Sequence, residues 1–188
     1  MKLSDRFENA MVYAARLHRG QVRKGTEIPY ISHLISVAGI ALDYGADEDE
    51  AIAALLHDAI EDQGGDQTRQ EIDRRFGPEV VKIVNGCTDA EVQPKPPWRE
   101  RKEAYIEHLK HAPRSVRLVS AADKVHNARS ILKDYRETGE VLWGRFNGGK
   151  EGTLWYYRSL VSVFRSAPVV PMIDELDRIV TEIEGMAS

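Results

Sequence analysis

The sequence predicts an all-α fold, a single bundle of about eight to nine helices. Apolar residues recur at the three- and four-residue spacing of amphipathic helices along most of the chain, whereas the long alternating pattern of a half-buried strand is missing. Capping residues, glycines and prolines interrupt this periodicity where helices would begin and end. Because 188 residues is a usual size for one domain, we expect residues 1–188 to form a single domain around one core.

The predicted helix boundaries follow from capping and helix-breaking residues. Asp5 with Glu8, and Asp47 with Glu50, have the spacing of a capping box, which satisfies free N–H groups in a first turn. Pro78 suits a first turn, where its missing N–H costs no hydrogen bond. Three prolines within the four residues 94–97 exclude a helix there, so we interpret that segment as a surface loop. In chain order, the expected helices cover residues 5–20, 32–45, 47–64, 68–76, 78–86, 98–110, 115–135, 152–165 and 172–185.

The helix expected over residues 47–64 is apolar nearly all round, yet the stretch "LLHDAIED" places His57, Asp58, Glu61 and Asp62 on one face of it. On the solvent edge of an amphipathic helix these acidic residues would lie near its C-terminus, where they oppose the helix dipole. In the interior, carboxylates are unfavourable unless they pair with cations or bind a metal. Residues 51–67 contain no Lys or Arg, so we expect the compensating cation to come from elsewhere.

Two further apolar helices each carry an isolated polar group. His33 lies in the first turn of one, on the same face as Val37 and Ile40, and Asp123 lies among the alanines and valines of the helix over 115–135. Each residue alone is more often a hydrogen-bonded core residue than a ligand. Three helices that present imidazoles and carboxylates can nevertheless share one site, and two imidazoles with two carboxylates suit Mn²⁺, Fe²⁺ or Zn²⁺ better than Ca²⁺.

Composition limits the classes of partner. The net charge of −4 argues against a long nucleic-acid backbone, although a local basic pocket could still receive a small anion. Cys87 is the only cysteine, which excludes an intramolecular disulfide and a cysteine-based zinc site and favours a reducing, cytoplasmic location. No stretch approaches the roughly 20 apolar residues of a membrane span, so we expect neither export nor a membrane partner.

Four motifs in order, "LHRGQVRKGTEIPYISH", "ISHLISVA", "LLHDAIED" and "AADKVHNARSI", resemble the HD-domain hydrolases of the RelA/SpoT type. These enzymes remove pyrophosphate from the 3′ position of guanosine tetra- and pentaphosphate, (p)ppGpp. The similarity extends from Ala15 to Leu132, and the best comparison is with the short, stand-alone alarmone hydrolases, including the metazoan SpoT homologues. One departure is Leu34, which stands where the family usually has proline.

The resemblance implies a role for each residue that matches a motif. The implied metal ligands, with manganese as the usual ion, are His33, His57, Asp58 and Asp123. Glu61 and Asp62 match the acidic pair associated with hydrolysis, which inactive versions of the domain lose. The implied substrate contacts, from the basic loop, the base pocket and a later helix, are Arg23, Lys24, Asn127, Ser130 and Lys102. The histidines that match no ligand position, which we interpret as supporting or surface residues, are His18, His108, His111 and His126.

The activity that the resemblance implies is metal-dependent hydrolysis of (p)ppGpp to GDP or GTP plus pyrophosphate. Two alternatives stay open: hydrolysis of another phosphorylated nucleotide such as NADPH, a dinucleotide or a deoxynucleotide, and a non-catalytic nucleotide-binding scaffold. The scaffold predicts degraded ligand positions, and none is degraded here. The expected partner is a small-molecule nucleotide, with a homo-oligomer left open. Lys150, Tyr156 and Tyr157 could close over the substrate, although core packing is the favoured role for the two aromatic residues.

Overall fold

The architecture is all-α, as the sequence predicts. A computed structural model describes residues 2–88, 94, 96–166 and 170–188, and within these ranges the only β feature is an isolated antiparallel bridge between Val22 and Pro29. The helices in the described part of the chain are α1 (Asp5–Leu17), α2 (Ile31–Asp43), α3 (Glu48–Leu56), α4 (Ala59–Asp62), α5 (Asp66–Phe76), α6 (Pro78–Cys87), α7 (Trp98–His111), α8 (Arg114–Thr138), the 3₁₀-helix η1 (Gly139–Arg145), α9 (Gly149–Arg165) and α10 (Ile173–Ala187).

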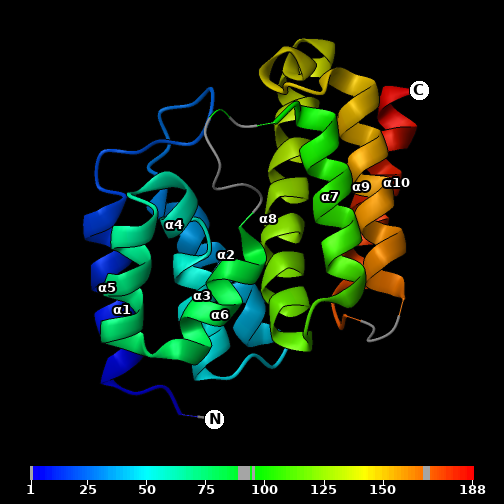
Figure 1. Cartoon of the computed structure of the whole chain (residues 1–188). Coiled ribbons are helices and arrows are strands. Elements are labelled where there is room, and N and C mark those ends of the chain that lie inside the picture. Colours follow the sequence, from blue (N-terminus) through cyan, green and yellow to red (C-terminus); the bar gives the residue numbers. More distant parts are fainter. Residues whose placement is uncertain (1, 89–93, 95, 167–169) are drawn as a thin grey trace.

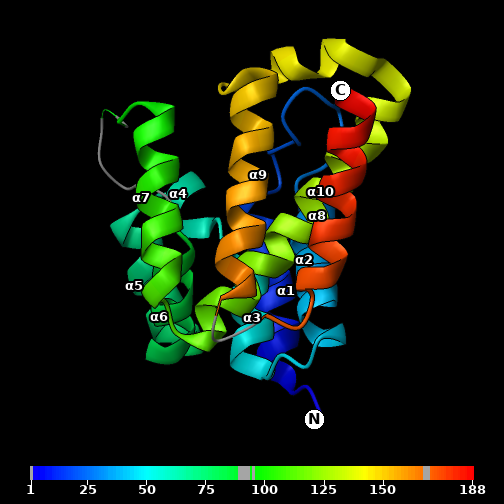
Figure 2. The ribbon, with the colours of Figure 1, turned by 90° about the vertical axis from the view of Figure 1, so that its right-hand side faces the viewer.

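The 25-residue helix α8 joins the two halves of the bundle (Figure 1). It packs against α2, α3 and α6 on one side and against η1, α9 and α10 on the other. Helix α7 packs against α9, and α9 runs beside α10 (Figure 2). None of the helices in the described ranges combines the length and the apolar character needed to cross a membrane. A single helix therefore carries residues that face both halves, which is how α8 can contribute to a site between them.

A buried arginine near the N-terminus of α8 bonds to the C-terminal ends of α7 and α9. Arg117 of α8 is 0% exposed, and its guanidinium donates to the carbonyl oxygens of Leu109 at 2.6 Å, Val163 at 2.8 Å and Ser166 at 2.8 Å. These carbonyls lie at helix C-termini, where backbone oxygens lack intrahelical partners and carry partial negative charge. The guanidinium thus satisfies several buried acceptors and is itself stabilised by them.

Some predicted helix ends are confirmed and others are wrong. The capping box of α3 is present, since the Asp47 side chain accepts from the Glu50 N–H at 2.8 Å and the Glu50 side chain accepts from the Asp47 N–H at 2.9 Å. Pro78 begins α6 as predicted. The predicted capping box at the start of α1 is wrong, because Ser4 is the N-cap and its hydroxyl accepts from the Arg6 N–H. Helix α1 also ends at Leu17, before Gly20.

The helix expected over residues 47–64 is in fact two helices, α3 and α4, with His57 and Asp58 between them. Nδ1 of His57 donates to the carbonyl oxygen of Ala54 at 2.9 Å. In a continuous helix that carbonyl would accept from the N–H of Asp58. The imidazole therefore competes for a backbone acceptor, and the chain turns at this dipeptide.

Close packing of α6 on α8 gives a stability prediction. A Cβ atom on Gly86 would lie 2.5 Å and 2.8 Å from the two methyl carbons of Val116, so we expect Gly86→Ala to lower the free energy of unfolding by about 1–3 kcal/mol in urea denaturation. The control is Gly39→Ala in α2, where no described atom lies within 4 Å of the new Cβ. Its better helix propensity should stabilise the protein by up to ~1 kcal/mol. Equal effects of the two substitutions would contradict the α6–α8 packing.

Candidate functional site

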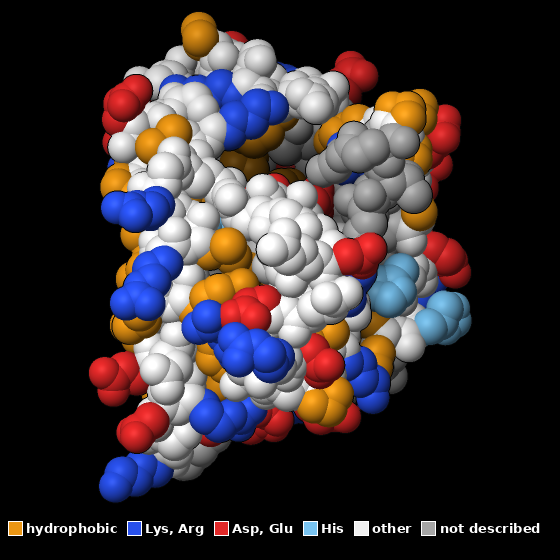
Figure 3. Space-filling model, turned by 60° about the vertical axis from the view of Figure 1, so that its left-hand side comes forward, with side chains coloured by type: hydrophobic (Ala, Val, Ile, Leu, Met, Phe, Trp, Pro, Cys, Tyr) orange, Lys and Arg blue, Asp and Glu red, His pale blue; other side chains and the backbone are white. Residues whose placement is uncertain are grey.

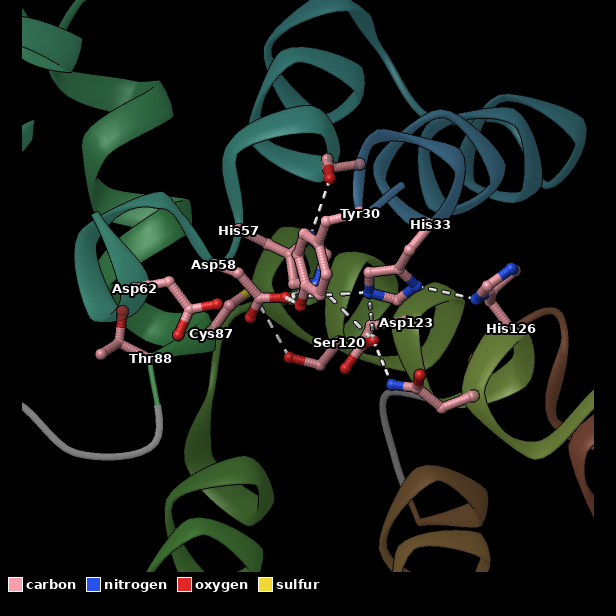
Figure 4. Close-up of polar contacts among 12 residues, drawn as sticks. Tyr30, His33, His57, Asp58, Asp62, Cys87, Thr88, Ser120, Asp123 and His126 are labelled. Atoms are coloured by element: carbon pink, nitrogen blue, oxygen red, sulfur yellow. Dashed lines mark hydrogen bonds and ion pairs between the residues drawn. The ribbon is translucent and has the colours of Figure 1, made fainter. Parts of the chain in front are cut away.

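Four polar side chains from three helical segments meet below a cleft (Figure 4). His33 comes from α2, His57 and Asp58 from the turn between α3 and α4, and Asp123 from α8. Nε2 of His33 lies 3.2 Å from Oδ1 of Asp123 and 3.7 Å from Oδ2 of Asp58. Nε2 of His57 lies 3.0 Å from Oδ2 of Asp58 and 3.6 Å from Oδ1 of Asp123. The exposed fractions of the imidazole side chains are only 1% for His33 and 3% for His57.

Hydrogen bonds at the far ring nitrogens orient both imidazoles. Because Nδ1 of His57 donates to a carbonyl, Nε2 is the nitrogen that can offer a lone pair. That Nε2 is buried and has no hydrogen-bond partner of acceptable geometry among the described residues. Nδ1 of His33 pairs with Nδ1 of His126 at 2.7 Å, and burial, followed by the charges of His33 and Arg23, lowers the pKa of His126 to about 4. Both Nε2 atoms consequently face the same space between the carboxylates.

The donor set fits a divalent transition metal. The ligand atoms of His33, His57 and Asp58 all lie within 4.8 Å of one another, and Asp123 approaches both imidazoles from α8. Burial would raise the pKa of Asp58, but the charge of His57 and the close approach of both imidazoles hold it well below its usual range. Without a metal, a proton on His57 would balance these ionised carboxylates, and a bound cation would replace that proton. Two imidazoles with two carboxylates can therefore hold Mn²⁺, Fe²⁺ or Zn²⁺.

Neighbouring side chains fix the two carboxylates. The phenol of Tyr30 donates to Oδ2 of Asp58 at 2.5 Å, and Nδ2 of Asn127 donates to Oδ1 of Asp123 at 2.5 Å. Lys124 forms an ion pair with the other oxygen of Asp123. The sequence reasoning overlooked Tyr30 and Lys124, although both lie within the quoted motifs. Groups of this kind set the orientation of metal ligands.

The cleft above these groups has a volume of about 640 Å³. Figure 3 shows it as a hollow with basic side chains at its rim. Its acidic lining residues are Asp58, Glu61, Asp62, Asp123 and Asp134. Its basic lining residues are Arg23, Lys24, Arg101, Lys102, Lys124, Lys133 and Arg145. An excess of cations over a floor of carboxylates suits an anionic ligand bound beside a metal.

The structure places every predicted substrate contact at the cleft wall. These residues, whose roles stay predictions, are Arg23, Lys24, Lys102, Asn127 and Ser130. Asn127 also accepts from Nη2 of Arg23 at 2.9 Å, which links the basic loop to the hydrogen bond on Asp123. Asp62 lies at the cleft with its side chain open to solvent, and partial desolvation, followed by the negative charge of Asp58, raises its pKa.

The remaining predicted residues divide between the cleft and the surface. Tyr156 and Tyr157 are buried and line the cleft, whereas Lys150 pairs with Glu140 at 3.2 Å and does not line it. Among the other histidines, His18 is buried and His111 is exposed. Most of the proline-rich segment, residues 89–93 and 95, lies outside the described residues.

A profile of the HD domain matches residues 10–152. The chain belongs to the HD-domain family. The similar guanosine-3′,5′-bis(diphosphate) 3′-pyrophosphohydrolases MESH1 of Xenopus tropicalis and Homo sapiens are 41% and 40% identical over 124 and 122 residues, which is 64% and 63% of this chain. The matched segments span just under two thirds of these HD proteins, 66% and 65% of their lengths. A GTP pyrophosphokinase rsh of Brucella melitensis is 41% identical over 128 residues, 65% of this chain but 16% of that protein.

A solved structure with the same HD fold covers almost the whole chain. It is a metazoan ortholog of SpoT that is described as hydrolysing ppGpp and acting in starvation responses. The two structures superpose with a TM-score of 0.79 and 28% sequence identity, over 99% of each chain. The all-α fold class and the resemblance to this family are thereby confirmed.

The four-residue site predicts metal-dependent stability. After metal removal, adding Mn²⁺, Fe²⁺ or Zn²⁺ at about 100 times its Kd should stabilise the wild type by about 2.7 kcal/mol in thermal denaturation. His57→Ala should lose most of this effect and retain little metal after dialysis. His111→Ala, which alters an exposed imidazole, is the control and should behave as wild type. A His57→Ala protein that binds metal as tightly as wild type would contradict the site.

Proposed function

We propose that the protein is a metal-dependent phosphohydrolase that removes the 3′-diphosphate of guanosine tetra- or pentaphosphate and yields GDP or GTP plus pyrophosphate. The observation that carries the proposal is a pair of carboxylates, Asp58 and Asp123, that line a cleft with many basic residues and are backed by two buried imidazoles. The printed activity of the MESH1 relatives and of the SpoT ortholog supports the same substrate. Manganese is our choice among the ions that this donor set suits.

A divalent ion held by His33, His57, Asp58 and Asp123 would supply polarisation of the scissile diphosphate and a lowered pKa for water. Arg23, Lys24 and Lys102 line the wall and would pair with the phosphate oxygens through charge-assisted hydrogen bonds. Such pairing is needed because the carboxylates at the floor nearly cancel the charge of a divalent ion. Asn127 and Ser130, on the next turns of α8, would contact the base or the ribose.

Glu61 and Asp62 would orient the attacking water and accept its proton. The raised pKa of Asp62 brings it closer to neutral pH than an ordinary aspartate, which favours a general base. The water oxygen would attack the phosphorus bonded to the 3′ oxygen, that P–O bond would break, and the 3′ oxygen would leave and take up a proton. The attacked phosphorus would leave within pyrophosphate.

We further propose that residues 1–188 act as one domain, because α8 packs against both halves of the bundle. A small-molecule nucleotide is the proposed partner. The proposed compartment is a reducing cytoplasm, in line with a single cysteine.

The assay that tests the function incubates manganese-loaded protein with guanosine tetraphosphate, NADPH, a dinucleotide and a deoxynucleoside triphosphate. We expect GDP and pyrophosphate from the first substrate. Asp62→Asn should lower kcat about 10²–10⁴-fold with little change in KM, because it removes a proton acceptor rather than a binding contact. The control is Asp174→Asn on α10, an exposed carboxylate outside the cleft.

Two results would overturn the proposal in different ways. Hydrolysis of another nucleotide without pyrophosphate release from guanosine tetraphosphate would exclude the substrate and keep the chemistry. Nucleotide binding with no turnover of any substrate would favour the scaffold.

A further inference from the structure

A chain of hydrogen bonds that the proposed mechanism does not use ends at Asp62. Nε2 of Gln21 donates to Oδ2 of Asp62 at 2.8 Å. The other end of the same amide, Oε1 of Gln21, lies 2.7 Å from Nδ1 of His18 and accepts from Nε2 of Gln63 at 2.7 Å. His18 and Gln21 follow α1, whereas Asp62 and Gln63 lie at the end of α4, so these hydrogen bonds connect two separate segments beside the cleft that Asp62 lines.

The partners of Gln21 determine which way its amide faces. An amide oxygen only accepts hydrogen bonds and an amide nitrogen only donates them. In the reverse orientation the oxygen of Gln21 would face the carboxylate of Asp62, so two acceptors would meet at hydrogen-bond distance. An ionised Asp62 therefore favours the observed orientation, and this requires a hydrogen on Nδ1 of His18. Burial lowers the pKa of His18, which is consistent with a neutral ring whose single hydrogen lies on Nδ1.

His18 is held in place by the residues that also support the metal ligands. It is 2% exposed and stacks on Tyr30, with ring centroids 5.4 Å apart and planes inclined by 22°. The hydroxyl of Tyr30 donates to Asp58. The stacked rings of His18 and Tyr30 therefore contact two parts of the site. The Tyr30 hydroxyl bonds to the candidate metal ligand Asp58, and His18 is connected to Asp62 through Gln21.

We propose that Gln21 is a positioning residue that holds the carboxylate of Asp62 toward the reacting water, and that His18 acts through Gln21. The inference rests on the proposed function, because it takes Asp62 as the proton acceptor. Asp62 needs such support because it is solvent-exposed and ends the four-residue helix α4, so neither burial nor a long helix selects one rotamer for it. Small displacements of a reacting group lower the rate strongly.

Four variants separate positioning from packing. Gln21→Met keeps the length of the side chain but removes the donor, and His18→Leu removes the donor to Gln21. His18→Asn keeps a donor, because the amide nitrogen of asparagine lies where Nδ1 of histidine does. Gln21→Glu keeps an acceptor for His18 and Gln63 but sets a carboxylate against Asp62. If His18 only fills space, leucine should be tolerated better than asparagine at this buried position. Positioning predicts the opposite order.

Steady-state kinetics on guanosine tetraphosphate should show kcat lowered about tenfold or more in Gln21→Met and His18→Leu, and further in Gln21→Glu. KM and metal content should stay within about twofold of wild type. His18→Asn should keep most of the wild-type kcat. A wild-type kcat in Gln21→Met, or a higher kcat in His18→Leu than in His18→Asn, would overturn the proposal.

A second measurement makes failure of this proposal distinguishable from failure of the proposed function. Three-bond NMR couplings on the diamagnetic, Zn²⁺-loaded protein report the χ1 rotamer of Asp62 without any need for turnover. We expect one rotamer in the wild type and His18→Asn, and averaging in Gln21→Met and His18→Leu. If the wild type releases no pyrophosphate but these couplings change as expected, the proposed function fails while the positioning contact stands. Unchanged couplings in Gln21→Met would refute the positioning role.

Discussion

Two carboxylates packed against two buried imidazoles make the strongest demand on how the helices of this bundle fit together. The Asp123 side chain is 8% exposed and the Asp58 side chain 25%, so both carboxylates are partly removed from water, and unpaired charge there is destabilising. Lys124 compensates part of this charge, and a proton on His57 or a divalent cation held by the imidazoles would compensate the rest. Such a site requires α2, α3 and α8 to keep their relative positions, and fully buried aliphatic residues hold all three together, Leu34, Leu56 and Val119 among them.

The remaining helices complete a cleft above this group in which basic side chains outnumber acidic ones. Helices α7 and α9 and the 3₁₀-helix η1 form the wall opposite the HD dipeptide, and that wall and the basic loop contribute most of the cationic lining. The break between α3 and α4 directs Asp58 to the floor and carries Glu61 and Asp62 to the side. Ligands for a metal at the floor, cations on the wall and a carboxylate with raised pKa at the edge suit the phosphohydrolase chemistry proposed above.

The sequence predicts the parts of the site that conflict with their local surroundings. His33 and Asp123 could be predicted because each interrupts an apolar helical pattern, and a capping box could be predicted from two residues three apart. Contacts between distant segments leave no such local signal. The break at His57 coincides with a side-chain hydrogen bond to a backbone oxygen, and the contacts among His18, Gln21 and Asp62 depend on two segments that meet in space. The helical spacing of apolar residues in the sequence gives no sign of either contact.

Pulsed electron paramagnetic resonance of the Mn²⁺-loaded protein tests whether His33 and His57 bind the metal, because hyperfine couplings identify the ligand atoms. Coordination by both residues predicts couplings to two imidazole nitrogens, with one lost when either His33 or His57 is replaced by alanine. It also predicts that both couplings persist in His126→Ala, since His126 contacts His33 through the nitrogen that faces away from the carboxylates. A spectrum that shows only oxygen ligands, or nitrogen couplings that survive removal of both His33 and His57, would contradict it.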